Sequence, residues 1–139
     1  MKKGLSKKQG GAASIEFAAV FVLLFLLFYT LVGYSIPLLL GASYQEVAAD
    51  ALREALRHSS SQSAEQDVAR IIDDSWLPQG WVSVCEDYPE TYLNVVGNTW
   101  SVCLRHDQPA AIMPALSILG WRIPSLPAEI RGEASILRY

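Results

Sequence analysis

A long stretch without charge near the N-terminus constrains this chain most. Between Glu16 and Glu46 there is no charged residue, and positions 17–40 alone supply 24 mostly apolar residues. An α-helix of that length reaches roughly 36 Å, which exceeds the roughly 30 Å of a bilayer's hydrocarbon core. A helix that is apolar on every face is typical of a membrane span. We therefore expect residues 12–44 to form a transmembrane helix.

Charge is distributed unevenly on the two sides of this span. Residues 1–11 contain four lysines and no acid, whereas the rest of the chain holds seven arginines and 14 acids, a balance of −7. Lysines directly before a span hold that end in the cytoplasm, so residues 45–139 should lie on the far side of the membrane. The acidic balance of this exported part, with its arginines scattered singly, gives no electrostatic footprint for nucleic acid.

A cleaved signal peptide is the alternative interpretation of the N-terminus. The basic start fits it, and residues 41–43 are small enough for a cleavage site. The apolar region of a signal peptide is roughly 7–15 residues long, however, and the stretch here is far longer. Length therefore favours a retained span.

Glu16 is the unusual residue of the stretch. A carboxylate at the entrance to a span either has a function or lies ionised among the lipid headgroups. It follows a lysine-rich leader and a glycine, at the fifth position after Gly11, and this pattern resembles the type IV prepilin signal, which a membrane peptidase cuts after the glycine. Cutting after Gly11 makes Ala12 the first mature residue and Glu16 the fifth, whereas cutting after Gly10 would make Glu16 the sixth.

The amino-acid sequence of the segment is more specific than this spacing alone. GAASIEF, a long apolar run and then YQEVAADALREALR resemble the TadE-like family of tight-adherence pilus assembly proteins. The resemblance implies a small pilin-like component (pseudopilin) of a bacterial secretion and pilus apparatus in the inner membrane. Its partners would be a prepilin peptidase, other pilin-like subunits and pilus assembly proteins. Glu16 would accept the α-ammonium of Ala12 from a neighbouring subunit, and the buried ion pair would cost less than either charge alone.

Gly33 and Pro37 form a predicted weak point near the outer end of the span. Proline cannot donate to the carbonyl four residues back and would crowd it, and glycine at that place is the least obstructive residue. We expect a kink there. Many members of the TadE-like family carry a proline early in the span, and this chain departs from that pattern.

Beyond the membrane the sequence predicts a small α+β domain. The long helix should continue over residues 45–58, with His58 at its end, and residues 59–139 should form a periplasmic domain. Ser63 with Gln66 is typical of the start of a second, short helix. Strands are expected over 81–85, 91–96, 100–105 and 130–139, with a hairpin turn at Gly97-Asn98. Pro114 to Leu119 should form a helical turn capped by Gly120.

Cys85 and Cys103 leave two arrangements of these strands open. In a three-strand meander Tyr92 would lie between the cysteines, which would then be roughly 9–10 Å apart and too distant for a bridge. If strand 81–86 pairs directly with 99–106, the cysteines can face each other and residues 87–98 form a loop. An exported domain with two cysteines favours the second arrangement and a disulfide.

The sequence thus predicts an α+β fold: a long N-terminal transmembrane, pilin-like helix, a short helix and a small antiparallel sheet. The function expected from the resemblance is structural. An uncleaved single-pass membrane protein with a periplasmic partner- or ligand-binding domain is the alternative. We expect no enzyme, cofactor or metal site, because no catalytic set of Ser, His and Asp converges and two cysteines with His106 make a poor zinc set.

Overall fold

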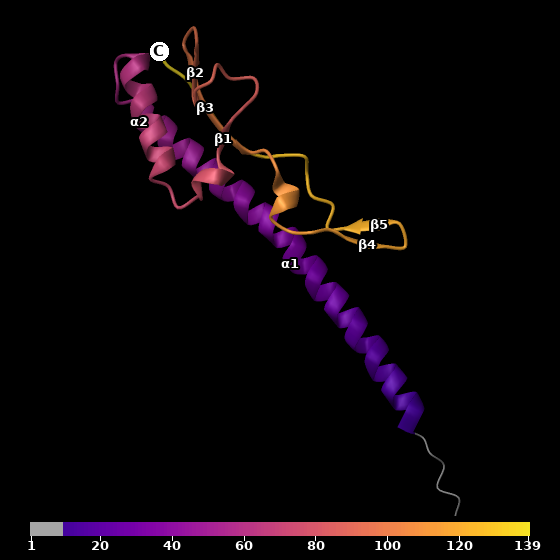
Figure 1. The fold of residues 1–139 in the computed structure, drawn as a ribbon. Helices are drawn as coiled ribbons and strands as arrows, with labels where there is room; N and C mark the ends of the chain where they lie inside the picture. The colour runs from indigo at the N-terminus through magenta and orange to yellow at the C-terminus, as the bar shows by residue number, and fades with distance from the viewer. Residues whose placement is uncertain (1–9) are drawn as a thin grey trace, which may run out of the picture.

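The computed structural model describes residues 10–139, so the lysine leader lies outside the described residues. One long helix, α1 (Gly10–Ala55), runs the length of the molecule, and the remaining elements gather around its C-terminal part (Figure 1). These are α2 (Ser61–Asp73), η1 (Gln79–Trp81), β1 (Ser83–Val84), β2 (Leu93–Val96), β3 (Thr99–His106), η2 (Pro109–Ala111), β4 (Leu116–Ile118), β5 (Trp121–Ile123) and β6 (Ile130–Leu137). The predicted α+β class is confirmed.

Strand β3 is the centre of the main sheet. Along one edge it pairs with β6 over its whole length, from Thr99 opposite Leu137 to His106 opposite Ile130. Its other edge is shared, because β2 pairs with its first half and β1 with its second half, all antiparallel. The predicted turn at Gly97-Asn98 joins β2 to β3, and Gly97 there has φ +59°, a conformation that glycine adopts without cost.

This shared edge decides between the two arrangements of the cysteines. Strand β1 pairs directly with β3, with Val84 opposite Leu104, and Cys85 and Cys103 form a disulfide with their Cα atoms 5.9 Å apart. The expectation that residues 87–98 are only a loop was wrong, since β2 forms within them and continues the same edge of β3. Because β1 is only two residues long, β1 and β2 can both pair with the same edge of β3. Neither of the two predicted arrangements allowed both pairings.

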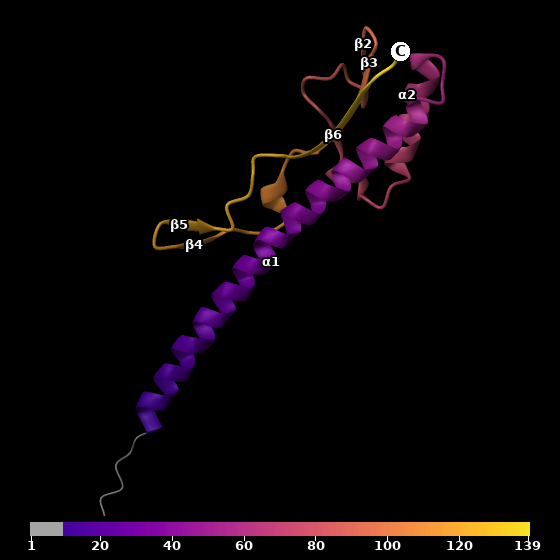
Figure 2. The ribbon, with the colours of Figure 1, turned by 180° about the vertical axis from the view of Figure 1, so that it is seen from behind.

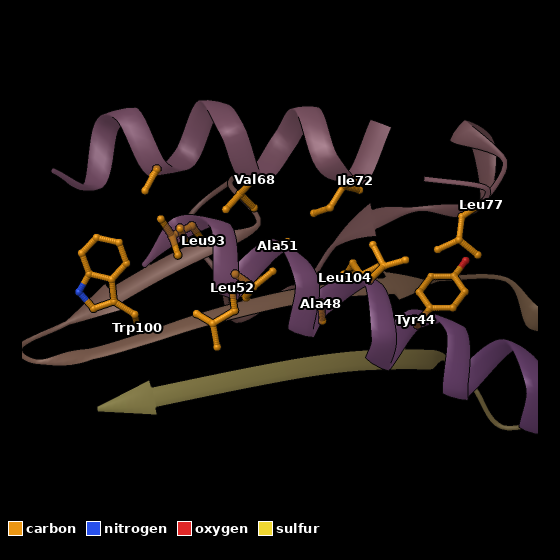
Figure 3. Close-up of a cluster of buried hydrophobic side chains, with 14 of the residues drawn as sticks. Tyr44, Ala48, Ala51, Leu52, Val68, Ile72, Leu77, Leu93, Trp100 and Leu104 are labelled. Atoms are coloured by element: carbon orange, nitrogen blue, oxygen red, sulfur yellow. The ribbon is translucent and has the colours of Figure 1, made fainter. Parts of the chain in front are cut away.

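The core lies where the second half of α1 is packed between α2 and the sheet (Figure 3). Three alanines of α1, at positions 48, 51 and 55, are completely buried and allow close approach on both sides. The tightest approach is between α1 and β6, where a Cβ on Gly132 would overlap the backbone of Tyr44 and Gln45. Only glycine therefore fits at that point of β6.

Three local predictions were wrong. Helix α1 ends at Ala55 rather than at His58, because the chain turns there toward α2. Helix α2 is capped by Ser60, whose hydroxyl accepts the backbone N–H of Ser63, and not by a box starting at Ser63.

The third error concerns Pro114 to Leu119, which form no helix. Residues 116–123 are a hairpin of β4 and β5, with Ile118 opposite Trp121. Leu119 and Gly120 both have positive φ, +52° and +82°, so the glycine closes a two-residue turn instead of ending a helix.

Candidate functional site: the bare half of α1 and its outer end

Helix α1 has two halves with different surroundings, which we call the bare half (residues 11–32) and the packed half (residues 33–55). In both views the bare half extends away from α2 and the main sheet, and only its last turns, at Tyr29, come beside the segment that carries β4 and β5 (Figures 1 and 2). Its large apolar side chains are exposed on all sides, for example Phe17 at 74% and Leu24 at 64%. By length and composition α1 is one helix that could cross a membrane.

Aromatic side chains are stacked along the bare half at one-turn spacing. The rings of Phe17 and Phe21 lie 6.4 Å apart, and those of Phe25 and Tyr29 lie at the same distance. Residues four apart share one face of a helix, so these pairs present flat apolar surface to whatever surrounds the helix. Such a surface is suited to lipid chains or to apolar helices of other chains, and not to water.

The three residues of the predicted processing site lie at the start of the bare half. Gly11 is inside the first turn of α1, and a Cβ there would meet no described residue within 4 Å. Ala12 and Glu16 are four positions apart and so share a helix face. Glu16 is exposed, and among the residues described it makes no hydrogen bond or ion pair. The fold of this chain therefore gives no reason for a glycine at 11 or a carboxylate at 16.

At the outer end of the bare half the chain returns to the helix. A Cβ on Gly33 would lie 3.0 Å from Cγ of Pro124, so glycine lets this proline, which follows a cis peptide bond, lie directly against α1. Sequence reasoning explained Gly33 only through Pro37 and missed this contact, since nothing local links positions 33 and 124. Helix α1 continues through Pro37, and the kink there remains a prediction.

Two tyrosines of α1 fix the same returning segment. The hydroxyl of Tyr29 donates to the carbonyl of Pro114 at 2.7 Å, and the hydroxyls of Tyr34 and Ser125 lie 3.4 Å apart. Both tyrosines belong to the apolar stretch, where a hydroxyl needs a partner. The segment that carries β4 and β5 is thereby held at the level of residues 29–34.

On the face of the sheet opposite the core, an ion-pair network surrounds the disulfide. Arg131 makes two hydrogen bonds to Asp87, at 3.0 and 2.9 Å, and one to Glu133 at 2.9 Å. Its guanidinium lowers the pKa of the Asp87 carboxyl, and the hydrogen bond to Asp87 raises the pKa of Arg131. The hydroxyl of Tyr88 donates to Glu133 at 2.9 Å. These contacts attach the loop after Cys85 to β6, which is a structural role.

Glu54, His58 and Asp67 bring three potential metal ligands within 4.8 Å of one another. Arginines already occupy both carboxylates, because Arg57 lies 3.3 Å from Glu54 and Arg70 lies 2.8 Å from Asp67. His58 Nε2 is 2.6 Å from Asp67. We interpret the cluster as ion pairs that close the turn between α1 and α2.

Comparison with known proteins gives one family. Residues 11–53 match the family described as TadE-like protein. The match begins at the glycine of the predicted processing site and ends two residues before the end of α1, so the resemblance seen in the sequence is confirmed over this helix. No curated protein and no solved structure matches the chain.

Proposed function

From the TadE-like match over residues 11–53, we propose that this chain is a minor pilin-like subunit of a bacterial tight-adherence pilus assembly or secretion apparatus. In this proposal residues 1–11 are a leader, residues 12–44 span the inner membrane, the remainder of α1 to Ala55 extends that helix outward, and residues 59–139 form a periplasmic domain. The subunit acts by binding other subunits and not as an enzyme.

The observation that carries the proposal is the coincidence of the family match with a helix that is bare over its first half. A globular protein has no use for some 22 residues of exposed apolar helix, because apolar surface in water is unfavourable. The hydrocarbon core of a membrane can surround such a helix, and a bundle of similar apolar helices can take the place of that lipid. A pilin-like subunit must be able to occupy both environments.

Gly11, Ala12 and Glu16 have the roles that the prepilin pattern gives them. Among the described residues Gly11 has open space around it, and it costs helix stability relative to alanine, so its presence is better explained by a peptidase that prefers a small residue there. Cleavage after Gly11 would free the α-ammonium of Ala12. Glu16 is available on the helix surface to accept that ammonium from a neighbouring subunit, which would replace two unfavourable lone charges with one pair.

One observation favours a second candidate, an uncleaved single-pass membrane protein that binds a partner or ligand in the periplasm. An open groove of about 520 Å³ lies between α2 and the loop before β2, lined by Gln62, Glu65, Gln66, Ala69, Glu90, Thr91 and Tyr92. Two carboxylates and two amides in its lining could bind hydrogen-bond donors of a partner, beside a larger apolar surface. This candidate requires neither Glu16 nor cleavage, and the two can therefore be separated by experiment.

Contacts between subunits through Glu16 test the proposal. A photo-crosslinking residue at Val20, one turn beyond Glu16, should give crosslinks to pilin-like subunits in native membranes. Glu16→Ala and Glu16→Gln should reduce that yield at least about tenfold, since each leaves a neighbouring ammonium unpaired. Glu46→Ala, which removes an exposed carboxylate from the packed half, is the matched control and should not change the yield. Equal crosslinking with and without Glu16 would contradict the proposal and favour the second candidate.

A further inference from the structure

The hairpin of β4 and β5 has one apolar face and one polar face. Its register places Leu116 opposite Ile123 and Ile118 opposite Trp121. Because alternate residues of a strand point to opposite faces, these four side chains share one face and the pair Ser117 and Arg122 occupies the other. The segment 108–128 that carries the hairpin contains one charged residue, Arg122.

The other described residues leave this hairpin largely uncovered. Within residues 10–139 the two strands pair only with each other, in a sheet separate from β1, β2, β3 and β6. Figures 1 and 2 show the hairpin projecting sideways from α1, well below the main sheet. Trp121 is 75% exposed, and Leu119 at the tip is 96% exposed with positive φ. A two-stranded hairpin is marginally stable alone in water, so an apolar one of three-residue strands needs a covering partner.

Contacts to α1 set the level of the hairpin relative to the membrane. Its base is fixed through Tyr29, Gly33 and Tyr34. Counted from Gly11 at 1.5 Å per residue, Tyr29 lies about 27 Å and Tyr34 about 35 Å along the helix, on either side of the roughly 30 Å that a bilayer core measures. Counted from Glu16, the same residues lie at about 20 and about 27 Å, in the outer third of the core. Either origin brings the hairpin to the outer leaflet.

We propose that the β4–β5 hairpin is a second membrane contact, in which Leu119 and Trp121 enter the outer-leaflet interface beside α1. The inference rests on the proposed function in one respect, that α1 spans the membrane with the domain outside. Tryptophan is enriched at this level of membrane proteins, where an apolar ring with one polar N–H is well solvated. Arg122, on the polar face, lies where it can bind a lipid phosphate, and no carboxylate occurs in the segment to oppose that contact.

The open edges of the hairpin limit how deeply it can enter. Unpaired backbone N–H and C=O groups are not tolerated in hydrocarbon, but water and headgroups satisfy them at the interface. The strands therefore lie along the headgroups, and the side chains of the apolar face reach toward the acyl chains. Such a contact would fix the rotation of α1 about its own axis and hold the domain at one height above the membrane.

Lipid quenching of Trp121 tests the inference. The full chain is reconstituted in vesicles of phosphatidylethanolamine and phosphatidylglycerol, with and without bromine on the acyl chains near the headgroup. The contribution of Trp121 is the difference in fluorescence between the wild type and Trp121→Phe. In the brominated vesicles this contribution should lose at least half of its intensity. Trp76→Phe is the matched control, because Trp76 is 64% exposed but lies beside Glu46 and Asp50 of the packed half, and the fluorescence it removes should not be quenched. Leu119→Ser should weaken quenching of Trp121 and leave the near-ultraviolet dichroism of the domain unchanged.

The outcomes separate this inference from the proposed function. If the chain resists alkaline carbonate extraction but the Trp121 fluorescence is unquenched, the hairpin does not contact lipid and the inference is overturned, whether water or a second copy covers it. If carbonate extracts the chain, α1 does not span the membrane, and both proposals fail. Quenching that is equal for Trp121 and Trp76 would also overturn the inference, because it would place the whole domain on the membrane.

Discussion

The two halves of α1 belong to one continuous helix and differ in what covers them. In the packed half Tyr44, Ala48 and Ala51 are fully buried under α2 and the sheet, whereas in the bare half Phe17 and Leu24 remain mostly exposed. The packed half combines small buried residues with a charged outer face. The bare half carries large apolar side chains on every face. A stripe of alanine thus marks a helix surface that its own chain covers, and an all-round surface of Leu and Phe marks one that only a membrane or another chain can cover.

Gly132→Ala should damage the packed half most. Its Cβ would overlap the backbone of α1 at Tyr44, which cannot move aside as a side chain can. We expect a loss of more than about 4 kcal/mol in the free energy of unfolding of the domain, a size reserved for such severe defects. Urea denaturation in detergent, followed by tryptophan fluorescence, measures it. Gly80→Ala, with open space around Gly80, is the control and should change little.

Leu27→Lys should damage the bare half alone. A lysine near the middle of a span disfavours insertion by about 3–4 kcal/mol relative to leucine. The fraction of chain that resists carbonate extraction should therefore fall sharply, while the urea midpoint of the domain stays that of the wild type. Leu27→Ala should insert normally. A domain that unfolds together with Leu27→Lys would show that the two halves are not independent.

Removing the disulfide should weaken the packed half by a somewhat smaller amount. The bridge closes a loop between residues separated by 18 positions, and the chain-entropy estimate for such a loop is about 3 kcal/mol. The double variant Cys85→Ala with Cys103→Ala should show that loss in urea and insert into membranes as the wild type does. A thiol count on the denatured, unreduced wild-type chain should find none, and two reactive thiols would refute the bridge.

Acidification should produce the smallest effect, through His106. Burial lowers the pKa of this histidine, against a weaker opposing effect of Asp107. Its Nδ1 accepts the N–H of Gln108 at 3.1 Å, and its ring lies 5.4 Å from that of Trp81. In the unfolded chain the pKa of His106 is about 6.5, and in the folded chain it is lower. Between these two pKa values the unfolded chain binds more protons than the folded one, so the free energy of unfolding falls as the pH falls from about 6.5 to the folded pKa. Urea midpoints across this range should decline less in His106→Gln, and an identical slope would exclude His106 as the cause.

The sequence predicted the features that depend on local pattern. Hydropathy located the first part of α1, glycine and asparagine located the turn before β3, and the expected compartment suggested the disulfide. The errors arose where contacts with residues distant in sequence determine the local structure. Pro114 and Gly120 resemble helix boundaries, and only the pairing of β4 with β5 shows that Gly120 closes a hairpin. Gly33 and Gly132 likewise owe their identity to Pro124 and Tyr44, about 90 positions away in each case, contacts that no local pattern encodes.

The mass of the mature chain tests the central claim most directly, namely that the bare half is a pilin-like helix and not a plain anchor. Protein purified from the membranes of its native host should begin at Ala12, having lost the leader after Gly11. Gly11→Arg should block that cleavage, and Gly11→Ala should slow it mildly, although a Cβ at this position would meet none of the described residues within 4 Å. A wild-type chain that retains residues 1–11 in a host with an active prepilin peptidase would contradict the account.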